Sequence, residues 1–146
     1  MFITVNALKE MEACLYQVAA FRAEWPDGVE INEEAVLRAF EIGLDVDWFA
    51  GAFLKRWQYE YYVDAVYPQQ RALRNAHQKY LKIRDAADEQ SYRELNEVSV
   101  WRHTNAYWDA LDLHQTAYLW AVIPYQKACE QAKATALVAA TEKERE

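Results

Sequence analysis

The chain has 146 residues, a formal net charge of −7 and only three glycines and three prolines. Hydrophobic residues make up 53% of the sequence, which is enough apolar material for a folded core and argues against a disordered chain. The scarcity of Gly and Pro excludes turn-rich and collagen-like designs, so the composition predicts an all-α domain.

The charge is unevenly placed along the chain. Residues 1–50 contain ten acidic and three basic residues, whereas residues 51–146 contain thirteen of each. The net negative charge therefore lies in the first third of the sequence. Such asymmetry bears on partners and solubility rather than on the fold.

Residues 1–46 are expected to form a small acidic helical head. Phe2–Val5 alternates weakly and fits a short strand or an extended arm. Asn6 can cap a helix that begins at Ala7, and Trp25–Gly28 is a strong turn signal. The apolar positions of that helix recur at helical spacing and are Leu8, Met11, Leu15, Val18 and Phe21.

A second helix is expected after the turn. Asn32 can cap it, and Glu33 and Glu34 suit the positive end of its dipole. Gly43 is placed to close this helix, and Asp45 or Asp47 to cap the next one.

Residues 47–146 are expected to form a long antiparallel helical hairpin, because their apolar residues follow the alternating three-and-four spacing of a coiled-coil seam. The intervening positions Gln90, Glu94 and Glu97 are polar and should not stay buried, so we place the turn within residues 88–97. One continuous helix in a dimeric coiled coil is the competing interpretation. A frayed tail is expected from about residue 141. The seam residues are Ala52, Tyr59, Tyr62, Val66, Leu73, Ala76, Tyr80, Ile83 and Ala87, then Trp101, Trp108, Leu111, Tyr118, Val122, Tyr125, Cys129, Ala132, Ala136 and Ala139.

Two segments of this region resemble each other. Residues 62–72 and 118–128 share Tyr, Ala-Val, Pro, Gln and Ala at equivalent positions. Pro68 and Pro124 should kink or open their helices, because each removes a backbone donor. The hairpin would also bring Gln69 near Gln115, where two buried amides could satisfy each other.

The candidate partner-binding residues are acidic and aromatic. The acidic residues could bind a basic surface of a partner. Runs of charged residues are, however, most often solvated faces, and aspartates that precede helices are most often helix caps. The aromatic set falls off the seam and could pack on the head or face a partner. Because residues 51–146 are neutral overall, direct nucleic-acid binding is not expected. These candidates are Glu30, Glu33, Glu34, Glu41, Asp45 and Asp47, with Tyr61, Tyr67, Tyr107 and Trp120.

The sequence contains no recognisable catalytic, cofactor-binding or metal-binding motif. His103 and His114 are eleven residues apart, which is not the usual spacing of helical metal ligands. Cys14 and Cys129 are expected to be reduced and buried. With no signal peptide or membrane-spanning segment recognised, a cytoplasmic location is expected.

The head resembles that of a family of small bacteriophage and proteobacterial prophage proteins. The resemblance implies an acidic helical head followed by Tyr/Ala/Pro-rich helical repeats, of which the segments around Pro68 and Pro124 look like eroded copies. The family offers no established catalytic residues to carry over. The matching residues are Leu8–Cys14, Gln17, Val18, Phe21, Trp25–Glu30, Leu44–Trp48 and Ala50.

These features favour a non-enzymatic module that binds a host protein or complex, such as an inhibitor of anti-phage defence of the anti-CRISPR type. One alternative is a structural or assembly protein that self-associates through the helical seam, giving a homodimer. Another is a small enzyme whose site combines Tyr, His and carboxylate groups.

Overall fold

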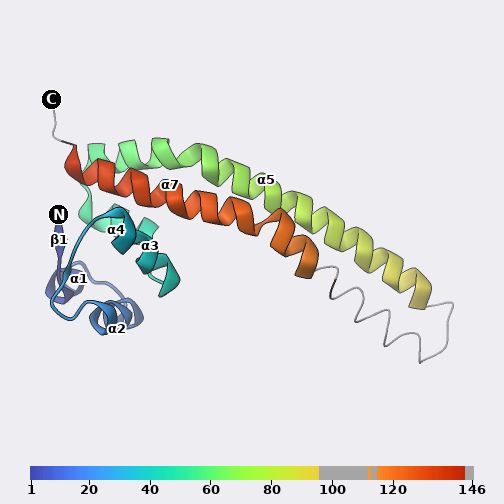
Figure 1. Ribbon diagram of the computed structural model, residues 1–146, viewed down its shortest axis with the longest axis horizontal. Coiled ribbons are helices and arrows are strands. Elements are labelled where there is room, and N and C mark those ends of the chain that lie inside the picture. Colours follow the sequence, from blue (N-terminus) through green and yellow to red (C-terminus); the bar gives the residue numbers. More distant parts are fainter. Residues whose placement is uncertain (96–111, 113–114, 144–146) are drawn as a thin grey trace. The chain divides into compact units, whose positions relative to one another are not determined.

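The computed structural model describes residues 1–95, 112 and 115–143. They contain the helices α1–α5 and α7, a further helical stretch at residues 115–121 and one two-stranded sheet, so the all-α class is confirmed (Figure 1). The chain divides into two compact units. The first contains Met1–Pro68 and Cys129–Glu146, and the second contains Gln69–Ala128.

The two short strands close the N-terminal part of the first unit. β1 (Phe2–Ile3) pairs antiparallel with β2 (Val29–Glu30), with Ile3 opposite Val29. The predicted turn before β2 is confirmed, since the Gly28 amide donates to the Trp25 carbonyl at 3.1 Å. Gly28 has a φ of +94°, and a Cβ there would lie 2.6 Å from the Ile3 carbonyl oxygen, so this turn requires glycine.

The single helix expected after β1 is in fact two helices. α1 (Val5–Glu10) is capped by Thr4 rather than by Asn6, because the Thr4 hydroxyl accepts from the Ala7 amide at 3.2 Å. Glu12 then adopts a φ of +60°, and α2 (Leu15–Glu24) starts afresh. This break leaves Leu15 88% exposed, although the helical spacing had placed it in the core. Met11 is also exposed, whereas Leu8, Val18 and Phe21 are buried as expected.

The next two helices begin where the capping residues indicate. α3 (Glu33–Glu41) is capped by Asn32, whose side-chain oxygen accepts from the Ala35 amide at 2.9 Å, and Gly43 follows it with a φ of +78°. α4 (Val46–Phe53) is capped by Asp45. Leu54 and Lys55 separate α4 from the following helix, so the predicted long helix does not start at residue 47.

The core of the first unit extends beyond the predicted head boundary at residue 46. Its buried residues are Ile3, Leu8, Val18 and Phe21, and Trp48, Phe49 and Phe53 of α4 pack against them. Leu137 also lines a cavity of about 50 Å³ in this core, so a helix from the C-terminal end of the chain completes it.

The long helices run antiparallel within the first unit. α5 (Arg56–Leu95) and α7 (Ile123–Glu142) meet where the Gln58 side-chain amide donates to the Ala140 carbonyl at 2.8 Å (Figure 1). In one continuous helix these residues would lie about 120 Å apart, so that interpretation is wrong. α7 remains helical through Glu142, past the expected start of fraying, and residues 144–146 lie outside the described part.

In the second unit, α5 contacts the helical residues 115–121. The rings of Tyr80 and Tyr118 meet edge to face at 5.2 Å, and Ala76 and Val122 are buried. The turn expected within 88–97 is absent from residues 88–95, which belong to α5, while 96 and 97 lie outside the described residues.

The predicted seam is correct in its centre and wrong at several positions. Tyr62, Val66, Ala76, Val122, Cys129 and Ala136 are buried, but Tyr59, Ile83 and Tyr125 are exposed. One heptad stripe drifts around a straight helix, which accounts for such departures. Trp101, Trp108 and Leu111 lie outside the described residues.

The two prolines have different local consequences. Pro68 lies inside α5, which continues through it, whereas a turn at Val122 interrupts the helix just before Pro124. The expected opening is therefore found at the second proline.

The proposed amide pair is wrong. Gln115 is exposed, and the buried Oε1 of Gln69 has no hydrogen-bond partner. The contact between Tyr80 and Tyr118 shifts the helical register by about 14 residues, or four turns, from the one that this pair requires.

Candidate functional site

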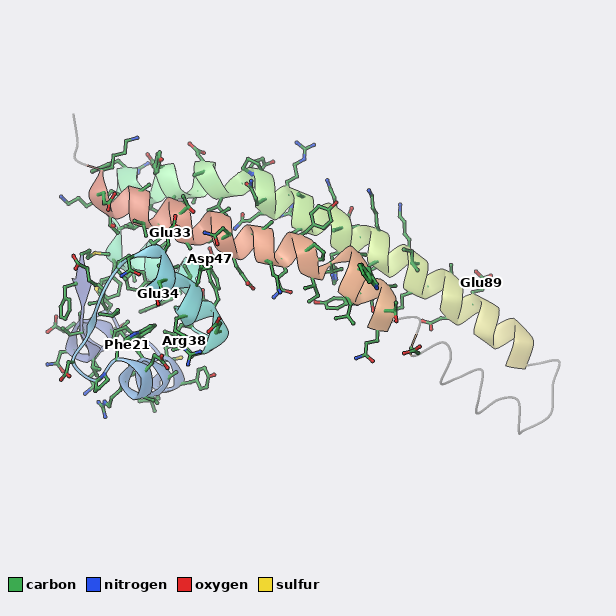
Figure 2. The ribbon with its side chains drawn as sticks, viewed as in Figure 1. Phe21, Glu33, Glu34, Arg38, Asp47 and Glu89 are labelled. Atoms are coloured by element: carbon green, nitrogen blue, oxygen red, sulfur yellow. The ribbon has the colours of Figure 1, made fainter. Side chains whose placement is uncertain are left out.

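An open depression on the first unit is the candidate functional site, and we call it the acidic depression. It has a volume of about 810 Å³ and carries four glutamates and one arginine. Figure 2 labels Glu33, Glu34 and Arg38 along α3. The lining residues are Glu24, Trp25, Val29, Asn32, Glu33, Glu34, Ala35, Leu37, Arg38, Glu41 and Gln131.

The position of the acidic side chains follows from how α3 folds. Asn32 starts the helix, and Glu33 and Glu34 occupy its first turn, where the helix dipole favours negative charge. Ala35 and Val36 point into the core and are buried. This anchoring holds the glutamates on the opposite, exposed side of a rigid element.

Arg38 organises one side of the acidic depression. Its Nε and Nη2 donate to the two carboxylate oxygens of Glu24 at 2.9 and 3.0 Å, and Nη1 donates to Glu41 at 2.8 Å. The hydrogen bond from Arg38 lowers the pKa of the Glu24 carboxyl, and the two carboxylates raise the pKa of the Arg38 guanidinium. In the part of the chain that the structure describes, neither Glu33 nor Glu34 has an ion-pair partner, so the unbalanced negative charge is concentrated there.

The depression also has apolar lining. Trp25, Val29 and Leu37 are half-buried, and the Trp25 ring packs against Phe21 with centroids 5.2 Å apart. Interfaces commonly place apolar residues at the centre and polar groups at the rim. This combination suits a segment that is both basic and apolar.

The six predicted acidic residues have different positions and roles in the structure. Glu33, Glu34 and Glu41 line the depression, whereas the exposed Glu30 on β2 does not. Asp45 serves as a helix cap, and its own amide donates to the Gln17 side-chain oxygen at 3.0 Å. Sequence reasoning missed Glu24 and Arg38, since only the packing of α2 on α3 brings residues 14 positions apart into contact.

Asp47 has a structural partnership within the first unit. It accepts a hydrogen bond from the Tyr62 hydroxyl at 2.7 Å and an ion-paired hydrogen bond from Lys133. We call these three residues the Asp47 clamp, because they join α4 to α5 and α7. Tyr62 is buried, and burial together with the Asp47 carboxylate raises the pKa of its hydroxyl.

Of the predicted aromatic residues, Tyr61 and Tyr67 belong to the first unit, and neither lines the depression. Tyr61 receives the Lys143 ammonium 4.0 Å from its ring centre, and Tyr67 is exposed on α5. Trp120, in the second unit, is 80% exposed. Tyr107 lies outside the described residues.

The remaining candidates for chemistry have ordinary surroundings. Cys129 is buried and free as expected, and burial raises the pKa of its thiol, whereas Cys14 is exposed, contrary to expectation. His103 and His114 lie outside the described residues. Within residues 1–95, 112 and 115–143, no three His, Cys, Asp or Glu side chains are grouped so that they could hold a metal ion.

No helix in the described ranges combines the length and apolar character needed to cross a bilayer. Comparisons with protein-family models, curated proteins and solved structures find no match for this chain.

Proposed function

We propose that this chain is a non-enzymatic module that binds a protein partner through the acidic depression. The observation that carries this proposal is that the depression is lined both by acidic side chains, which we call its rim, and by the apolar side chains of Trp25, Val29 and Leu37, which we call its floor. Glu33 and Glu34 supply charge without an ion-pair partner in the described part of the chain. A basic surface with an exposed apolar side chain is the matching partner chemistry.

The two parts of the depression have different roles in this proposal. The rim charges attract the partner and raise the association rate, an effect that salt reduces. The apolar floor supplies the contact area that slows dissociation, and Trp25 is of the residue type that most often dominates binding energy.

We further propose that the chain is encoded by a phage or prophage and that its partner is a host protein or complex of anti-phage defence. Resemblance of the head sequence to such proteins supports the origin. The acidic rim supports the target class, because a defence complex that holds nucleic acid presents a basic surface that carboxylates can occupy. Binding and inhibition would take place in the cytoplasm of the host cell.

The test compares two double variants of the full chain in bacteria that carry a defence system. Glu33→Gln with Glu34→Gln removes the unpaired rim charge, while Glu10→Gln with Asp64→Asn removes two exposed carboxylates elsewhere. Phage plating on the expressing cells and co-purification of defence proteins are measured together. We expect the wild type and the second variant to raise plating and retain the partner, and the first variant to lose both.

The proposal is wrong if the wild-type chain neither raises plating nor retains a defence protein. Retention that is equal in both double variants would place the binding surface away from the acidic depression.

A self-associating structural protein is the second candidate. Leu119 and Trp120 support it, since both are exposed on the helical residues 115–121. Central seam residues such as Val66 and Val122 are already buried within the chain, so self-association would use the exposed pair instead. Light scattering across a concentration series tests this candidate, and a monomer at every concentration would exclude it.

A further inference from the structure

A basic face follows α5 within the second unit. Residues 69–84 contain five basic residues and no aspartate or glutamate. Arg84 bonds the neighbouring Asp85 at 2.7 Å, which leaves Arg71, Arg74, Lys79 and Lys82, and these four define the basic face. All four are exposed.

The helical geometry places the four cations on one side of α5. At about 100° per residue they fall within an arc of roughly 140°, and they span about 16 Å along the helix axis. The opposite side carries buried Ala76 and the Tyr80 ring that packs on Tyr118. Figure 2 shows nitrogen-tipped side chains standing off this helix.

The basic face is not neutralised by the residues that the structure describes. None of the four cations has a carboxylate partner there. Asn75 and Gln78 lie between them and are exposed, so their amides are accessible to a ligand. Such amides and cations are the side chains that most often contact phosphate oxygens.

We propose that the basic face binds the phosphate backbone of a nucleic acid. A second copy of the chain, with its acidic depression, is the other source of matching charge, but the composition of the face favours phosphate. Protein interfaces are enriched in arginine, but they are depleted of lysine and centred on apolar groups. Between Arg71 and Lys82, by contrast, no large hydrophobic side chain is exposed.

Nucleic-acid binding was not predicted from the sequence, because residues 51–146 have no net charge. That balance is zero only because the acidic residues lie outside 69–84, and the helix then turns the cations of this segment to one side. The acidic first third of the chain repels phosphate, so binding through this face is weak and independent of base sequence.

Fluorescence anisotropy of labelled DNA mixed with the full chain tests the proposal. The probes are a single strand of about 20 nucleotides and the duplex of the same length. With about four phosphate contacts, raising the salt concentration fourfold weakens single-strand binding about 50-fold.

Two triple variants with the same change in charge separate the face from a general effect. Arg71→Gln, Arg74→Gln and Lys79→Gln remove most of the basic face, whereas Lys9→Gln, Arg22→Gln and Lys55→Gln remove three exposed cations of the first unit. Circular dichroism checks that both remain helical. We expect the first variant to lose at least about tenfold in affinity and most of its salt dependence, and the second to change by less than about twofold.

Three results would overturn the proposal. The first is the absence of binding to either probe at low salt, and the second is an equal loss in the two triple variants. The third is that the chain self-associates at low salt without DNA, and that the basic-face variant abolishes this self-association but leaves DNA binding unchanged. That result would assign the basic face to a second copy of the chain.

Discussion

The two units use different means to fix their structure. The first unit joins elements that are distant in sequence through specific groups: the Asp47 clamp, the ion pair of Arg38 with Glu24, which we call the Arg38 bridge, and the hydrogen bond from Gln58 to Ala140. In the second unit, as far as it is described, the helical segments meet through aromatic packing, with the Tyr80 ring against Tyr118. Specific polar groups fix one arrangement, whereas a repeating apolar pattern tolerates changes of register.

The largest expected effect concerns the apolar centre of the first unit. Leu137→Ala should destabilise the chain by about 2–5 kcal/mol, because this side chain is 1% exposed and its loss enlarges the core cavity. Leu119→Ala makes the same chemical change in the second unit at a side chain that is 52% exposed, and should cost less than about 0.5 kcal/mol. Urea unfolding followed by circular dichroism measures both, and equal costs would contradict the difference in packing.

Two glycines test whether single backbone positions control the stability of the first unit. Gly28→Ala should lower the free energy of unfolding by more than about 1 kcal/mol, because of the positive φ and the close Ile3 carbonyl. Gly51→Ala should raise it by about 0.5–1 kcal/mol, since Gly51 lies inside α4 and its new methyl meets only the Tyr59 ring at 3.8 Å. Thermal unfolding of the two variants should shift in opposite directions.

The Asp47 clamp should respond to removal of one hydroxyl. Tyr62→Phe should cost about 1–2 kcal/mol, because it deletes a hydrogen bond to a carboxylate while keeping the ring. Tyr67→Phe, at an exposed tyrosine of the same helix, should be nearly neutral. If chemical denaturation gives the two variants the same free energy of unfolding, the hydrogen bond of the Asp47 clamp adds nothing to stability.

Two glutamines sharpen the contrast between the units. Gln69→Leu should stabilise the chain by about 1 kcal/mol, because it removes a buried oxygen that lacks a hydrogen-bond partner. Gln58→Leu should destabilise it by a similar amount, because Gln58 donates to Ala140 and accepts from the Lys55 amide. Both variants are compared by urea unfolding, and a destabilised Gln69→Leu would show that the amide is satisfied in solution.

The smallest expected effect is the pH dependence of the Arg38 bridge. The pKa of Glu24 is lowered in the folded chain from its ordinary value of 4.5, so its contribution to stability is present above that value and is lost as the pH falls through the folded pKa. Glu24→Gln should flatten the acid side of the stability profile slightly relative to the wild type. Thermal unfolding between about pH 3 and pH 6 makes the comparison.

Local signals in the sequence were sufficient for several elements. The Asn32 cap, the Gly43 stop and the turn at Gly28 each depend on residues within a few positions of one another. The break between α1 and α2 was missed because it contains no Gly or Pro, and helical spacing of apolar residues continues across it.

The candidate site was only partly visible in the sequence. Glu33, Glu34 and Glu41 belong to one predicted helix and were found, but Glu24 and Arg38 meet only when α2 packs on α3. Asp47 was predicted as a helix cap or a partner-binding carboxylate, and its structural role was missed because its partners Tyr62 and Lys133 are 15 and 86 residues away.

The sequence by itself determined the helical class, the caps of α3 and α4 and the excess of negative charge in the first third. These properties arise from interactions within a turn or two of the chain. Tertiary structure alone decided the helical register, the burial of Leu137 of α7 in the core of the first unit and which carboxylates remain without ion-pair partners among the described residues. The physical reason is that a heptad pattern specifies a face but not its partner, so contacts between distant residues must select one register among several.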